Sequence, residues 1–188
     1  MHSSHAEVPA LPVNPELLKE VWPASWIAHL TASPCDYGVF HFRKTFSLDV
    51  KPAAFVIHLS ADNRYRLFVN GTSVCFGPAR GDLFHWRFET VDIGPWLRPG
   101  KNVVAATVWN FGPLKPWAQV SLQTGLIVQG DSVAEQVVNT GDTWKVLQDE
   151  AYSPSSEAPR PTNQFLVVGP GDRVDGSVYP WGWQEPDF

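Results

Sequence analysis

The chain has 188 residues, a formal net charge of −5, 44% hydrophobic residues and 18% charged residues. This length holds one sizeable domain, or one domain with tails, and the hydrophobic content excludes wholesale disorder. The negative charge argues against nucleic acid or an anionic membrane as a partner. The sequence contains no apolar run of about 18 residues, so no transmembrane helix is predicted. Nine Trp, eleven Phe and four Tyr favour either a β-sandwich core with interfaces or a sugar-binding surface.

The first segment of the chain is predicted to be mostly irregular. Residues 1–13 lack the charged region and apolar run of a signal peptide, so we expect either a cytoplasmic protein or a trimmed form of an exported one. Asn14, followed by Pro and Glu, predicts the start of a short helix that Pro23 ends. Trp22 and Trp26 are expected to anchor this segment on the domain that follows.

Four strands are predicted before residue 77. Apolar and polar side chains alternate in 37–48 and 54–59, which is the period of a strand with one buried face. The same alternation continues in 64–69 and 73–76. Asn70-Gly71 joins the last two strands, and because both residues tolerate positive φ, this dipeptide predicts a tight hairpin.

The remaining elements also read as strands separated by turns. Residues 103–108 are apolar on both faces, as expected of a central strand, and the apolar phase changes near Glu89-Thr90, which suggests a bulge or a strand end. The further candidate strands are 84–90, 122–129, 135–138, 144–147 and 165–168. Eight to nine strands with almost no helix predict an all-β fold, a two-sheet antiparallel β-sandwich of jelly-roll type.

Four runs of residues carry a family resemblance. They are ADNRYRLFVNG at 61–71, GPARGD at 77–82, HWRFETVDIGPWL at 85–97 and GKNVVAATVWNFG at 100–112. Together they resemble the N-terminal β-sandwich domain of bacterial α-L-rhamnosidases, and more broadly the galactose-binding-like sandwich that opens many multidomain glycoside hydrolases. The resemblance extends over about residues 22–150.

The resemblance implies a division of the chain into three parts. Residues 1–21 are expected to be a leader and short helix, 22–150 the β-sandwich domain, and 151–188 a linker and the start of a following domain. In the family such a tail leads into a second sandwich and later an α-helical barrel, which holds the catalytic acids. We therefore expect this chain to be an N-terminal piece of a larger glycoside hydrolase, without catalytic residues of its own.

The residues themselves contain no recognised catalytic motif. The sequence has no G-x-S-x-G, H-E-x-x-H, P-loop or G-x-G-x-x-G pattern, and its six His are scattered without metal-ligand spacing. No cofactor is expected, although acidic loops around Asp131 and Asp142 leave a structural calcium as a weaker alternative. Cys35 and Cys75 are expected to be two separate buried thiols rather than a disulfide, which spacing alone does not decide.

Carbohydrate sites combine aromatic ring faces with a few directional polar groups, and loops at one end of a sandwich are the usual place for them. The candidate carbohydrate-binding residues are Asp62, Asn63, Arg64, Arg80, Asp82, Trp86, Asn110 and Trp117, with Trp109 and Phe111 as further rings. In the alternative interpretation, the charged residues brace the loops, and Trp86 and Trp109 belong to the core. Trp117 is the ring that we most expect to be exposed.

Three functions remain open at this point. The first is a non-catalytic accessory domain of an α-L-rhamnosidase-like glycoside hydrolase, which supports the catalytic domain and contributes to substrate recognition. The second is an autonomous carbohydrate-binding module, and the third is a purely structural interdomain or oligomerisation domain. The expected partner is a rhamnose-containing glycan or the protein's own downstream catalytic domain.

Overall fold

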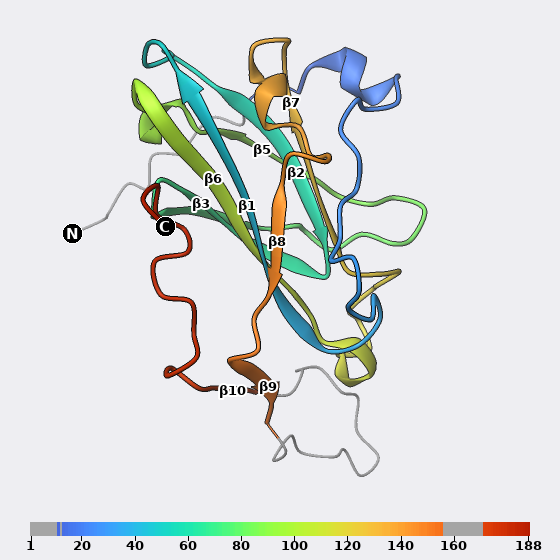
Figure 1. The fold of residues 1–188 in the computed structure, drawn as a ribbon. Coiled ribbons are helices and arrows are strands. Elements are labelled where there is room, and N and C mark those ends of the chain that lie inside the picture. Colours follow the sequence, from blue (N-terminus) through green and yellow to red (C-terminus); the bar gives the residue numbers. More distant parts are fainter. Residues whose placement is uncertain (1–10, 12, 156–170) are drawn as a thin grey trace, which may run out of the picture.

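The computed structural model describes residues 11, 13–155 and 171–188, and it confirms the predicted all-β sandwich. Two antiparallel sheets pack face to face (Figure 1). The larger sheet contains, in order, β4 (Thr72–Gly77), β3 (Arg64–Val69), β6 (Gly100–Asn110), β1 (Gly38–Leu48) and β8 (Lys145–Gln148). The smaller sheet contains β5 (Glu89–Asp92), β2 (Val56–Asp62) and β7 (Gly125–Gly130), and a separate pair is formed by β9 (Tyr152–Pro154) and β10 (Asp172–Val174). No helix in the described ranges is long and apolar enough to cross a membrane.

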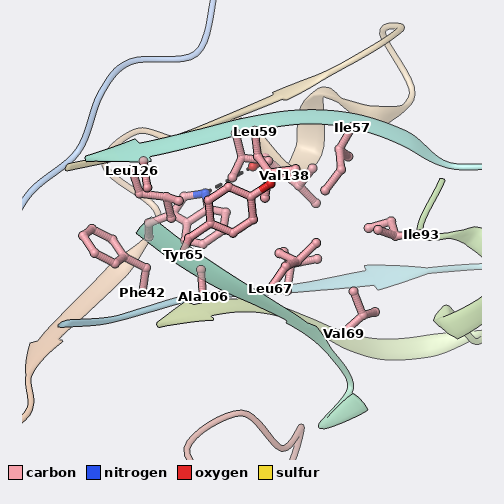
Figure 2. Close-up of a cluster of buried hydrophobic side chains, with 14 of the residues drawn as sticks. Phe42, Ile57, Leu59, Tyr65, Leu67, Val69, Ile93, Ala106, Leu126 and Val138 are labelled. Atoms are coloured by element: carbon pink, nitrogen blue, oxygen red, sulfur yellow. Dashed lines mark hydrogen bonds between the residues drawn. The ribbon is translucent and has the colours of Figure 1, made fainter. Parts of the chain in front are cut away.

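The core lies between the two sheets and follows the alternation read from the sequence. In β3, Tyr65, Leu67 and Val69 are completely buried, while their neighbours along the strand point to the other face. They meet Ile57 and Leu59 of β2 across the sandwich, as Figure 2 shows. Because each large apolar side chain contributes roughly 1.5–3 kcal/mol when fully buried, this alternation fixes which face of β3 turns inward.

The predicted hairpin at Asn70-Gly71 is confirmed. Both residues have positive φ, 49° and 83°, as a tight two-residue connection requires. The Asn70 side chain also ties the turn to the neighbouring strand: its amide donates to the Asn102 side chain at 2.8 Å, and its oxygen accepts from the Val103 N–H at 2.9 Å. The turn therefore fixes the register of β3 and β4 and connects this hairpin to β6.

Three predicted elements are corrected by the structure. The N-terminal helix is only a 3-10 turn, η1 (Pro15–Leu18), capped by the Asn14 side chain, which accepts from the Glu16 N–H. Residues 84–88 form a loop, so the strand begins only at Glu89. Residues 135–138 form a 3-10 turn, η4 (Glu135–Val138), because the Glu135 carboxylate accepts from the backbone N–H and hydroxyl of Ser132 and closes a turn there.

One further difference concerns the strand that follows η4. Because 135–138 is not a strand, β8 does not pair with it and instead extends the five-stranded sheet beside β1. The candidate strand at 165–168 lies outside the described residues. The remaining short 3-10 turns are η2 (Gly94–Trp96) and η3 (Gly112–Leu114).

Each sheet has its outer face covered by one of the terminal segments. On the three-stranded sheet, Trp22 packs against His58, with ring centroids 6.2 Å apart. On the five-stranded sheet, Trp183 stacks on His41 at 4.0 Å and is only 2% exposed. Figure 1 shows the C-terminal segment passing β9 and β10 and then running back along this sheet. A Trp side chain from each terminal segment therefore covers one outer face of the sandwich.

Candidate functional site

The eight sequence-predicted site residues come from three connections at the same end of the sandwich. These are the β2–β3 turn, the β4–β5 loop and the β6–β7 connection. Asn63 links the first to the third, because its backbone N–H donates to the Trp109 carbonyl and its side-chain oxygen accepts from the Phe111 N–H. Arg64 links the first to the second by donating to the Pro78 carbonyl at 2.5 Å. The eight predicted residues therefore lie together at one end of the sandwich.

Asp62 braces the β6–β7 connection. It is 2% exposed, and its Oδ2 accepts from the backbone N–H groups of Leu122 and Gln123 at 2.6 and 2.8 Å. Its Oδ1 accepts from the Asn63 amide at 2.5 Å. Both carboxylate oxygens therefore have protein donors, and the strand predicted from residue 122 begins only at Gly125 because these N–H groups turn toward Asp62.

Asn110 has a similar bracing role at the end of β6. Its side chain is 1% exposed. The oxygen accepts from the Gly112 N–H at 2.7 Å, and the amide donates to the Thr124 hydroxyl at 3.0 Å. Thr124 in turn donates to the Pro34 carbonyl at 3.0 Å. The amide and hydroxyl groups of this connection are used to hold its two ends together.

Asp82 organises the β4–β5 loop. Its Oδ1 accepts from the N–H groups of Phe84 and His85 at 2.8 and 2.9 Å, and its Oδ2 lies 2.9 Å from the His85 ring nitrogen. The hydrogen bond from His85, together with these backbone bonds, lowers the pKa of Asp82 below its ordinary value. Asp82 thus fixes the loop that carries Leu83 and Trp86.

Arg64, Arg80 and Trp86 border a cavity of only about 20 Å³. A cavity of this size holds a single water molecule, since one water occupies at least about 10–15 Å³ by this measure. The Trp86 indole N–H is buried and has no hydrogen-bond partner within the described ranges. The two arginines therefore do not surround a space that a sugar ring could enter.

A second, larger hollow lies on the other side of the same loops. Its volume is about 310 Å³, which is at the small end of the roughly 300–1,000 Å³ typical of ligand pockets. Trp26 and Trp86 form a corner in it, with ring centroids 6.3 Å apart and planes at 86°. Leu83 and Leu122 stand at the sides, 52% and 69% exposed, and Asp62 lies among the lining residues. This hollow is the candidate binding site.

Sequence reasoning identified only part of this site. Of the eight predicted residues, Trp86 and Asp62 line the hollow, whereas Trp117 is 77% exposed, as expected, but is not part of its wall. Trp26, Leu83 and Leu122 were missed. Trp26 had been assigned as an anchor, and no periodic signal distinguishes it from Trp22, because the segment that carries both is not a regular element.

The structure places the potential metal-ligating and thiol residues apart. Within the described part of the chain, no three His, Cys, Asp or Glu side chains cluster as a metal site requires, and Asp131 bonds instead to the His58 ring at 2.9 Å. Cys35 is an exposed thiol and Cys75 a half-buried one, and burial raises the pKa of Cys75 to about 11. The two cysteines are therefore separate, as expected, but the prediction that both are buried is wrong for Cys35.

Comparison with known proteins gives a consistent result. No family model and no curated protein matches the chain. Among solved structures, the GH78 family rhamnosidase of Bacillus sp. GL1 has a TM-score of 0.75 and 26% identity, covering 89% of this chain and 17% of that one. An α-L-rhamnosidase from Dictyoglumus thermophilum has a TM-score of 0.62 and 19% identity, and the match covers 89% of this chain and 20% of that one. An α-L-rhamnosidase from Aspergillus terreus has a TM-score of 0.55 and 16% identity, and the match covers 88% of this chain and 19% of that one.

This chain thus spans a fifth or less of the length of these enzymes. The two matches of lower identity show the shared fold, and the Bacillus match adds sequence likeness. The chain is therefore similar over nine-tenths of its length to one domain of GH78 α-L-rhamnosidases, as the runs between residues 61 and 112 indicate.

Proposed function

We propose that this chain is a non-catalytic N-terminal accessory domain of an α-L-rhamnosidase-like glycoside hydrolase, which supports the catalytic domain and contributes to recognition of a rhamnose-containing substrate. The observation that carries the proposal is the likeness to the Bacillus sp. GL1 rhamnosidase, which covers 89% of this chain but 17% of that enzyme. A fragment of this proportion fits one domain of a multidomain protein. Its partners are then the downstream catalytic domain and the glycan bound there.

The roles of the carboxyl groups at the candidate end support the non-catalytic assignment. Glycoside hydrolysis uses two carboxyl groups across the scissile bond, about 5–5.5 Å apart for retention and about 6.5–9.5 Å for inversion. Asp62 is buried with both oxygens hydrogen-bonded, and Asp82 is bound to the N–H groups of its own loop. Both carboxylates therefore have partners within their own connections, which supports a structural role for them.

A second candidate function, an autonomous carbohydrate-binding module, is favoured by one observation. The corner of Trp26 and Trp86 presents aromatic surface in a hollow that a small ring can enter. Aromatic faces of this kind hold the apolar face of a ligand ring. In this case the chain binds its ligand without help from a catalytic domain.

The proposal is tested by domain deletion and exchange in the Bacillus sp. GL1 rhamnosidase. We expect that removing the matched domain lowers kcat/KM for an aryl α-L-rhamnoside at least about tenfold, and that inserting this chain in its place restores part of the loss. A deletion variant with full activity and unchanged stability would contradict the supporting role. Hydrolysis of the same substrate at an enzymatic rate by this chain alone would contradict the non-catalytic assignment.

A further inference from the structure

We propose that the hollow between Trp26 and Trp86 binds the planar, largely apolar non-sugar part of a glycoside, an aryl aglycone, and not its sugar. The inference rests on the proposed function, because it takes the ligand to be a part of the substrate of the parent enzyme. It goes further by assigning a chemical class of ligand to a defined set of side chains.

The walls of the hollow are held in place before any ligand binds. One wall is fixed by Asp62, which accepts from the Leu122 and Gln123 N–H groups. A second is fixed by Asp82 through the turn that carries Leu83 and Trp86. Asp62 and Asp82 thus position apolar surface, and such preorganisation lowers the entropic cost of binding.

The third wall depends on a glycine and on one isolated strand-like bridge. Ile27 exchanges backbone hydrogen bonds with Leu126 at 2.9 and 3.0 Å, which places Trp26 beside the start of β7. A Cβ atom at Gly125 would lie 3.2 Å from the Trp26 ring, so the ring rests closely on the bare backbone there. The Trp26 ring is therefore packed on one side while 47% of the residue stays exposed.

The polar groups around the hollow argue against a hydroxyl-rich ligand. Recognition of a sugar needs several directional donors and acceptors with free capacity. Asp62 and Thr124 are buried, each Asp62 carboxylate oxygen accepts from a protein donor, and the Thr124 hydroxyl both donates to Pro34 and accepts from Asn110. Gln123 is the one exposed polar side chain in the lining, and the other side-chain surface comes from the two indole rings and from apolar residues, namely Ile27, Ala28, Leu83 and Leu122. A flat ring with few hydroxyls matches this surface better than a pyranose does.

The geometry of the corner fits a planar ligand. Because the two indole planes stand at 86° with centroids 6.3 Å apart, a ring that stacks on one indole meets the other edge-on. Offset-stacked and edge-to-face contacts are the favoured arrangements of aromatic rings.

The test titrates the 188-residue chain with three probes: phenyl α-L-rhamnoside, phenol and methyl α-L-rhamnoside. Binding is followed by NMR on the indole N–H signal of Trp86, assigned by its loss in a Trp86→Phe variant. We expect the two probes with a phenyl ring to shift this signal with dissociation constants on the order of millimolar, as suits a ligand of this size, and the methyl glycoside to leave it unchanged.

Matched variants distinguish binding in the hollow from nonspecific binding to exposed aromatic rings. Trp26→Ala is expected to weaken binding of phenol about 2- to 13-fold, as the loss of an aromatic stacking partner worth about 0.5–1.5 kcal/mol predicts. Trp117→Ala removes a more exposed ring that lies outside the hollow, and is expected to leave binding unchanged. Equal loss in both variants overturns the assignment to the hollow.

Two other outcomes also overturn the inference while leaving the accessory function intact. One is binding of methyl α-L-rhamnoside as tight as that of the phenyl glycoside with no binding of phenol, which makes the hollow a sugar site. The other is the absence of any shift with all three probes. The domain-deletion experiment tests the accessory function independently of ligand binding in the hollow. The failure of the aglycone proposal is therefore distinguishable from the failure of the accessory-domain proposal.

Discussion

Replacing Trp183 with Ala tests how strongly the C-terminal segment contributes to the stability of the sandwich. Trp183 is 2% exposed, packs against Val103 and Ala105 on the outer face of β6, and stacks on His41. An aromatic side chain buries about 150–250 Å², and at about 25 cal/mol per Å² this burial corresponds to roughly 4–6 kcal/mol. Measured losses for such truncations are about 3–5 kcal/mol.

The loss has an upper limit that follows from the position of Trp183 near a chain end. If the segment detaches, the sandwich keeps its core, and the free energy of unfolding falls by no more than the free energy of docking this segment. Arg43 also holds the segment, donating to the carbonyls of Trp183 and Glu185 at 3.1 and 2.9 Å. We therefore expect Trp183→Ala to lower the free energy of unfolding by about 3 kcal/mol, the lower end of the range.

Urea denaturation measures the global loss, and hydrogen exchange of the amides in 171–188 measures local opening. The same 3 kcal/mol corresponds to exchange about a hundredfold faster in this segment. Trp181→Ala is the matched control, because Trp181 lies in the same segment but is 73% exposed, and it should change stability by less than about 1 kcal/mol. Equal effects of the two substitutions would refute the role given to Trp183.

Three further predictions concern single positions. Asp62→Asn should lower the free energy of unfolding in urea by about 2–3 kcal/mol, since an amide places donors where a buried carboxylate accepts N–H groups. Burial lowers the pKa of His41 in the folded protein, despite Asp149 beside it, so the unfolded chain binds a proton at a higher pH than the folded one does. The free energy of unfolding should therefore fall as the pH drops below about 6.5. This fall should be shallower in His41→Gln. Gly100→Ala should cost about 1 kcal/mol in thermal or urea unfolding because φ is +83°, whereas Gly141→Ala, equally free of neighbours, should change stability by less than about 0.5 kcal/mol.

The features of the fold that depend on residues adjacent in the chain could be predicted from the sequence. Alternation placed Tyr65 and Leu67 in the core, and Asn70-Gly71 identified the hairpin, because a period of two and positive φ are local properties. The strand predicted at 135–138 failed because the Ser132–Glu135 hydrogen bonds favour a turn over the extended form that the apolar residues suggest.

The candidate site was harder to predict because it depends on contacts between distant residues. Trp26 reaches Trp86 only because Ile27 bonds to Leu126, about a hundred residues later in the chain. The sequence identified Asp62 and Asp82 as important, but not that one accepts from the β6–β7 connection and the other from its own loop. Distinguishing a brace from a ligand requires the identity of its donors, which residue type and spacing do not determine.

The long ladder between β1 and β6 has a consequence for how the chain folds. It pairs Gly38 with Asn110 and Leu48 with Gly100, so every contact joins residues 52 to 72 positions apart, and β2 to β5 lie between them in the sequence. Such a ladder closes large loops before it gains any stabilisation, and proteins dominated by non-local pairing fold in milliseconds to seconds. The β3–β4 hairpin closes over two residues and can form within about 1–10 μs. We therefore expect the rate-limiting event to be the arrival of β1 at the edge of a β3–β6 pair, with the two terminal Trp segments closing over the sheets afterwards.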